Sequence, residues 1–209
     1  MIATHQALIR EGRKKRKQRI EQWTRMKENA IYFFRNMSDE WAIEAGDLPR
    51  ISIIDSQEVS PDDRSPASLQ ISFSKIKTGF DALEPENGTA IETGCALVIA
   101  QDVYGTVICT IFPAKSALHE WKKKYIIIRF YRKPSELTEI ELEKVSRIFL
   151  AWQQYTSING TLRIIDRIRV ICSRVQDWRI NIINPRKFRW LIEKVVYRVI
   201  SQGMKWSDK

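Results

Sequence analysis

Apolar residues recur every three or four positions in the N-terminal part of the chain. This spacing predicts an amphipathic helix over residues 3–45, with one stripe turned to the core. The stripe fades before Ile20, and Gly12 weakens the helix there. Residues upstream of Ile20 are therefore expected to form either exposed first turns of the same helix or a mobile arm. The stripe runs Ile20, Trp23, Met26, Ala30, Phe33 or Phe34, Met37 and Trp41.

Five segments in the middle of the chain have the patterns of strands. Residues 50–55 and 68–76 alternate apolar and polar positions, which is typical of half-buried strands. Residues 95–101 and 106–112 flank "DVYG" and predict a hairpin, with Gly105 in the left-handed conformation at the turn. Residues 124–132 predict a fifth strand. The last three strands are apolar at consecutive positions, which favours cover on both faces.

Three helices are expected after the strands, over residues 134–155, 161–178 and 186–203. Pro134 near the first helical position and the acids that follow it suit a helix start. Asn159-Gly160 and Asn184-Pro185 mark the breaks between the helices. In the second helix six apolar residues share one face: Ile164, Ile165, Ile168, Ile171, Cys172 and Val175.

The order of these elements predicts an α+β fold: a long N-terminal helix, an antiparallel sheet of about five strands, and three C-terminal helices. Because the apolar strands need cover on both faces, we expect the N-terminal helix on one face and C-terminal helices on the other. A homodimer that covers one face is the alternative. One compact domain would then contain a basic helix or arm (1–46), a β region (47–133) with acidic loops at 56–67 and 77–92, and a basic helical region (134–209).

Composition favours a folded cytoplasmic protein. The chain has 209 residues, 44% of them hydrophobic, with no apolar run long enough for a transmembrane helix. No apolar segment follows the basic N-terminus, so no signal peptide is expected. The three cysteines, Cys95, Cys109 and Cys172, lie in apolar segments and predict reduced thiols in the core.

Charge is distributed unevenly along the chain. The net charge of +10 divides into +6 for residues 1–30, −8 for residues 31–112 and +12 for residues 113–209. A chain that is basic at both ends and acidic in the middle indicates a polyanionic partner, an anionic membrane or internal charge pairing.

The densest positive charge is "GRKKRKQR", residues 12–19. It resembles the arginine-rich RNA-binding segment of lentiviral Tat proteins, over these eight residues alone, and we infer no homology from it. Six cations in two helical turns can neutralise several phosphates and release their counterions. The alternative is a solvated basic helix end, or one paired with the acidic middle. The six cations are Arg13, Lys14, Lys15, Arg16, Lys17 and Arg19.

Arginines in the C-terminal third predict a second basic surface, because arginine binds phosphate in a bidentate manner and stacks on bases. Trp178, Trp190 and Trp206 lie among them, which suits single-stranded nucleic acid or a membrane interface. The alternative is that these tryptophans are core residues and the arginines form the solvated face. The arginines are Arg163, Arg167, Arg174, Arg179, Arg186, Arg189 and Arg198.

No segment predicts an enzymatic reaction. Pro61-Asp62 before a strand resembles the start of a restriction-nuclease motif, but Phe73 stands two residues before Lys75, where that motif needs an acid. The chain has two histidines, no Cys-x-x-Cys pair and no glycine-rich loop between a strand and a helix. We therefore expect neither a metal nor a cofactor.

These observations together predict a non-enzymatic polyanion-binding protein whose partner is nucleic acid. Two alternatives stay open. One is a peripheral membrane-associated effector component, because basic amphipathic helices with tryptophan also bind anionic lipid. The other is a subunit of a homo-oligomer or larger assembly, whose basic ends dock on the acidic middle of another copy.

Overall fold

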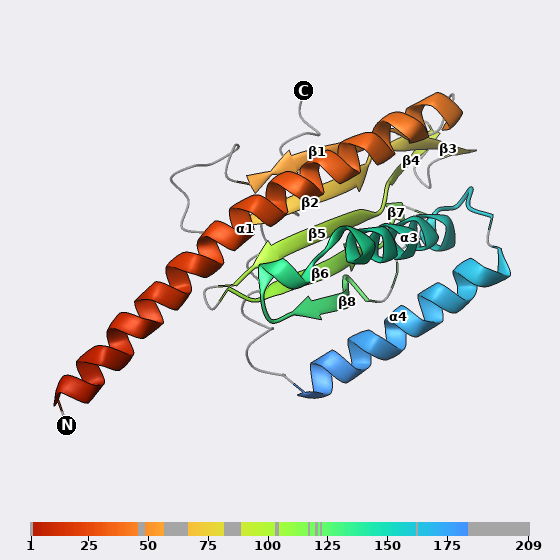
Figure 1. Ribbon diagram of the computed structural model, residues 1–209. Helices are drawn as coiled ribbons and strands as arrows, with labels where there is room; N and C mark the ends of the chain where they lie inside the picture. The colour runs from red at the N-terminus through yellow and green to blue at the C-terminus, as the bar shows by residue number, and fades with distance from the viewer. Residues whose placement is uncertain are drawn as a thin grey trace.

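The computed structural model describes residues 2–45, 49–56, 67–81, 89–102, 105–116, 118–119, 121, 123–161 and 163–183 (Figure 1). The elements are α1 (Ile2–Ala45), β1 (Ile51–Asp55), β2 (Ser68–Phe73), β3 (Ile76–Asp81), β4 (Thr89–Thr93), β5 (Ala96–Gln101), β6 (Val107–Phe112), β7 (Lys115–Ser116), β8 (Ile126–Tyr131), the 3-10 turn η2 (Pro134–Glu136), α3 (Glu139–Thr156) and α4 (Ile164–Ile183).

The main sheet has five antiparallel strands in the order β1-β2-β5-β6-β8. All five expected strands are present, and the predicted α+β class is confirmed. Ile71 pairs with Leu97, and Leu97 with Ile111, so the same face of each strand turns to the core. The third expected C-terminal helix, at 186–203, lies outside the described residues.

The turn between β5 and β6 has the predicted conformation. Gly105 has φ of 80°, in the left-handed region. The Asp102 carboxylate accepts a hydrogen bond from the Thr106 amide at 2.8 Å and closes the turn. A Cβ atom on Gly105 would lie 2.5 Å from Cδ of Arg19, so a side chain here would displace α1 from the hairpin.

The core lies between one face of the sheet and two helices, α1 and α3, which lie side by side (Figure 1). Trp23 and Phe34 of α1 are buried, and Phe73 of β2 stacks on Phe149 of α3 with ring centroids 5.1 Å apart. We expected α1 and the C-terminal helices on opposite faces, and for α3 this is wrong. The short connection after β8 packs Leu137 into the same core and returns α3 beside α1.

The β5–β6 hairpin is buried on both faces, as its consecutive apolar positions predict. Leu97 and Val107 belong to the core under the helices. Val98 and Ile108, which point to the opposite face, are each 1% exposed. A carboxylate introduced on either face would therefore be desolvated.

A second, smaller sheet of β3, β4 and β7 was missed by the sequence analysis, which expected a loop over residues 77–92. These strands are short and alternate only weakly between apolar and polar residues, so the sequence pattern does not reveal them. Pairing between the strands stabilises them more than the intrinsic β propensity of their residues does. The Thr78 hydroxyl donates to the Ala90 carbonyl at 2.9 Å across the pair. Buried Glu92 accepts from the Ile158 amide at 2.7 Å, which ties this sheet to the end of α3.

Polar contacts fix the helices to the sheet. On one side, the buried Lys27 ammonium of α1 pairs with the Asp55 carboxylate of β1. On the other, the Tyr131 hydroxyl of β8 donates to Glu141 of α3 at 2.9 Å. A hydrogen bond from Lys144 lowers the pKa of Glu141, and burial raises the pKa of Tyr131.

Candidate polyanion-binding surfaces

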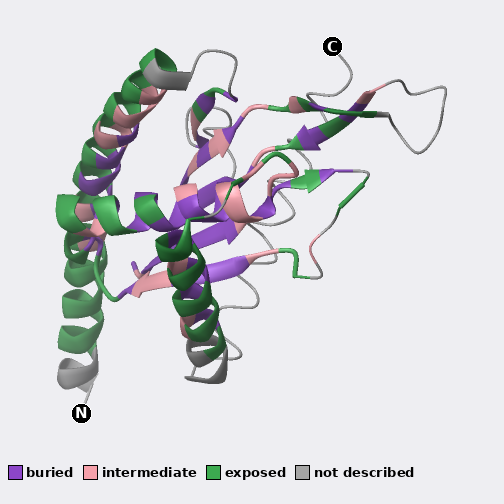
Figure 2. Cartoon of the chain, turned by 90° about the vertical axis from the view of Figure 1, so that its right-hand side faces the viewer, coloured by how far each residue is buried: buried purple, intermediate pink, exposed green. Residues whose placement is uncertain are grey.

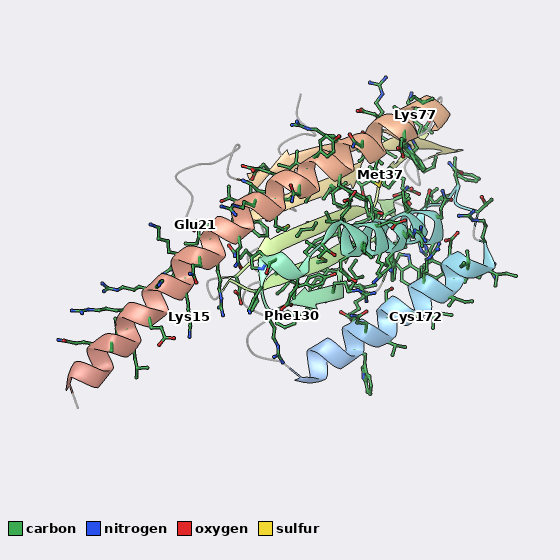
Figure 3. All side chains as sticks on the ribbon, viewed as in Figure 1. Lys15, Glu21, Met37, Lys77, Phe130 and Cys172 are labelled. Atoms are coloured by element: carbon green, nitrogen blue, oxygen red, sulfur yellow. The ribbon has the colours of Figure 1, made fainter. Side chains whose placement is uncertain are left out.

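The N-terminal part of α1 projects beyond the sheet (Figure 1). Five consecutive cations on it, Arg13, Lys14, Lys15, Arg16 and Lys17, are all exposed, and we call them the basic cluster. The helix continues without a break through Gly12, so the first of the two alternatives for this segment, exposed helical turns, applies. Residues 6–18 of α1 are all exposed (Figure 2), and Figure 3 labels Lys15 among them.

Arg19, the sixth predicted cation, differs from the basic cluster because it lies where α1 meets the sheet. Its backbone carbonyl accepts a hydrogen bond from the Gln101 side chain at 3.2 Å, and its side chain is half-buried beside Gly105. One turn further on, Trp23 is 2% exposed. The boundary between projecting and packed helix therefore falls at about Arg19.

Glu11 is the acid nearest to the basic cluster. Its carboxylate lies 2.6 Å from the Lys15 ammonium, one helical turn away, and this hydrogen bond lowers the pKa of Glu11. Both side chains are more than half exposed, so the pair is solvated and weak. Residues 2–19 carry seven lysine and arginine residues against this one glutamate, so the segment remains strongly positive.

The predicted C-terminal arginines divide into three groups. Arg163, Arg167 and Arg174 are exposed on or beside α4, and the Arg163 guanidinium lies 3.1 Å from the Asp166 carboxylate. Arg179 belongs to α4, but its side chain is not among those described. Arg186, Arg189 and Arg198 lie outside the described residues, as do Trp190 and Trp206.

The two basic surfaces lie on separate elements. The packed part of α1 contacts η2, β1 and β2 and its basic N-terminal part projects beyond the sheet, whereas α4 runs along the edge strand β8 (Figure 1). The structure therefore does not bring the basic cluster and the α4 arginines into one site.

The inward face of α4 places one apolar residue, Val170, in the core and is otherwise polar. The Asp177 carboxylate accepts a hydrogen bond from the Ile127 amide of β8 at 2.9 Å and also contacts the Lys123 ammonium. The Trp152 indole of α3 donates to the Ser173 hydroxyl at 2.9 Å. These buried groups dock α4 against an edge strand, whose backbone donors need acceptors.

The apolar face of α4 consequently points away from the protein. We expected the apolar face of this helix to cover the sheet and Cys172 to be a buried thiol, and for α4 both expectations are wrong, because Cys172 is exposed. A core position, the alternative given for the tryptophans, does not apply to Trp178, which is 64% exposed. We call this face the α4 stripe: Ile164, Ile165, Ile168, Ile171, Cys172, Val175 and Trp178.

Metal-ligating clusters and membrane-spanning helices are both absent from the described part of the chain. No three His, Cys, Asp or Glu side chains there are placed to hold a metal ion. No helix within those same residues combines the length and apolar character needed to cross a bilayer.

Comparisons of this chain with protein-family models, with curated proteins and with solved structures find no match in any of the three.

Proposed function

We propose that this protein binds nucleic acid through the basic cluster on the projecting part of α1. The observation that carries the proposal is that five consecutive cations are all exposed on the part of α1 that projects beyond the sheet. Five consecutive residues point to all sides of a helix. Phosphates can therefore contact the segment from several directions, and the contact is electrostatic rather than apolar.

The expected signature of such binding is a strong dependence on salt. Each phosphate that a cation neutralises releases counterions, and the logarithm of the affinity falls by about 0.7–0.9 per phosphate for each tenfold rise in salt. Arginine adds bidentate contacts to phosphate and stacking on unpaired bases. Single-stranded nucleic acid therefore suits a segment with two arginines and three lysines.

The test replaces Arg13, Lys14, Lys15, Arg16 and Lys17 with Gln and measures oligonucleotide binding by fluorescence anisotropy over a range of salt concentrations. The salt slope should become shallower by up to about four, since five phosphate contacts are removed. The melting temperature should stay the same, because these side chains lie outside the core. Arg19 is left in place, since it contacts the hairpin.

A matched control removes five exposed cations at scattered positions by the same substitution. Its net charge equals that of the first variant, so a difference between the two reports the position of the charges and not their number. Equal loss of affinity in both variants would contradict the proposal, as would binding that the first variant retains. The control positions are Arg25, Arg35, Lys75, Lys77 and Arg132.

A further inference from the structure

The α4 stripe is the largest group of exposed apolar side chains that the described residues place together. Six of the large ones lie on this one helix, including Ile164 at 79% and Trp178 at 64% exposure. Other exposed apolar residues, such as Ile43, Ile91 and Ile140, are scattered over separate elements. Single exposed apolar residues need no explanation, but a contiguous row of them marks an interaction surface.

The stripe cannot turn inward without loss. The opposite face of α4 carries Asp166, Ser173 and Asp177, each 5% exposed or less, at steps of seven and four residues. Rotating the helix would break the hydrogen bonds from the Ile127 amide and the Trp152 indole. It would also bring the arginines beside the stripe toward the sheet, where they would be desolvated.

Charge indicates what kind of partner the stripe fits. Asp166 and Asp177 are the two acids of α4, and both face inward. The outward side therefore carries apolar side chains next to Arg167 and Arg174, with Arg163 at the start of the helix. A partner has to be both apolar and anionic.

Neither a second copy of the chain nor residues 184–209 has a charge that favours binding to the α4 stripe. A second copy packed stripe to stripe would bring arginines toward arginines at the edges of the contact. Residues 184–209 carry seven lysine and arginine residues against two acids, so they share the sign of α4. Like charges held together at an interface are unfavourable.

We propose that α4 is an interfacial helix that lays the α4 stripe on an anionic lipid surface. The isoleucines would enter the boundary between headgroups and acyl chains, and Arg163, Arg167 and Arg174 would contact lipid phosphates. Trp178 suits the same depth, because tryptophan concentrates at membrane–water interfaces. This site is separate from the basic cluster and does not depend on nucleic-acid binding.

The position of α4 supports contact with a flat surface. The helix lies outside the edge strand β8, at the margin of the main sheet (Figures 1 and 2). The α4 stripe, from Ile164 to Trp178, runs along about 21 Å of a helix that is roughly 10 Å wide, so its area is on the order of 200 Å², well below the roughly 800 Å² per partner of a stable protein interface. A bilayer needs no complementary groove, whereas a protein partner would.

The test measures co-sedimentation with vesicles of phosphatidylcholine and phosphatidylserine, compared with phosphatidylcholine alone. Every protein carries the five Gln substitutions in the basic cluster, so that α1 does not contribute. Ile168→Glu with Ile171→Glu should lower partitioning by more than about tenfold, because two large apolar side chains no longer enter the interface. The matched control, Ile43→Glu with Ile140→Glu, alters isoleucines elsewhere that are more exposed than Ile168 and Ile171, and it should bind as before.

Cys172 gives a second readout, because it lies within the stripe and is exposed (Figure 3). Cys95 and Cys109 are buried, and burial raises the pKa of both thiols, that of Cys109 to about 12. An environment-sensitive thiol dye should therefore label Cys172 alone in the native protein. Its emission should shift to the blue on addition of vesicles that contain phosphatidylserine.

Several outcomes would overturn the proposal. They are absence of vesicle binding, equal loss of binding in the two Glu pairs, and binding without a shift of the dye. A dimer in solution that the Ile168 and Ile171 substitutions dissociate would assign the stripe to a second copy. The Cys172 thiol could also be protected before vesicles are added and become reactive when residues 184–209 are removed. That result would assign the α4 stripe to contact with residues 184–209.

Discussion

At the scale of single residues, buried polar groups fix the helices more specifically than apolar contacts do. The Lys27–Asp55 pair is an example, since its side chains are 11% and 5% exposed. Shifting α1 along β1 would separate the two charges and leave each of them desolvated. The pair therefore disfavours other registers of α1 against β1.

We expect Lys27→Ala or Asp55→Ala to lower the free energy of unfolding by about 3–5 kcal/mol, because either change leaves a buried charge without its partner. The double substitution Lys27→Met with Asp55→Leu should cost much less, since no charge is then buried. Urea denaturation measures all three. A cost of less than about 1 kcal/mol for each single change would mean that the pair behaves as a solvated surface pair.

At the scale of elements, the sequence predicts strands and helices well but not how α4 is turned. Its isoleucines at steps of three and four indicate an amphipathic helix, and the helix is present. The usual assumption that the apolar side faces inward fails, because β8 is an edge strand among the described residues and its Ile127 amide has Asp177 of α4 as its acceptor. The sequence contains one indication of this orientation of α4: Asp166 and Asp177, eleven residues apart, share the face opposite the isoleucines.

Asp177 is therefore expected to matter more than any isoleucine of α4 for stability. Asp177→Ala leaves the Ile127 amide without its acceptor and should cost about 1–3 kcal/mol. Asp177→Asn keeps an acceptor oxygen and should recover most of that loss. Hydrogen exchange of the Ile127 amide is the specific measurement, and it should accelerate in Asp177→Ala.

Asp39→Ala, at an exposed position on α1, serves as the control and should change neither stability nor exchange. If the Ile127 amide exchanged at the same rate in Asp177→Ala as in the parent protein, this hydrogen bond would not be what holds α4 to the edge strand.

At the scale of the whole molecule, the basic cluster and the α4 arginines lie outside the hydrophobic core. The five main strands and the long helix follow from periodicity, because each repeats a single pattern over several residues. The second sheet and the placement of α3 beside α1 cannot be predicted from periodicity. Both depend on contacts between residues far apart in the chain, such as Glu92 and Ile158. The sequence located the basic cluster, but only the structure shows that it projects beyond the sheet and that the α4 arginines lie on a separate element.

This separation predicts that the two surfaces can be removed independently. Deleting residues 1–18 should leave the melting temperature unchanged, because the first α1 side chain deep in the core is Trp23. The shortened protein should lose its affinity for oligonucleotides and keep the vesicle binding that we propose for α4. Deleting residues 1–27 should instead unfold the protein, since it also removes Trp23, Met26 and the Lys27 partner of Asp55. Circular dichroism melts of both proteins decide the matter: if the shorter deletion also lowers the melting temperature, the projecting part of α1 contributes to folding, and its cations are structural rather than free to bind a ligand.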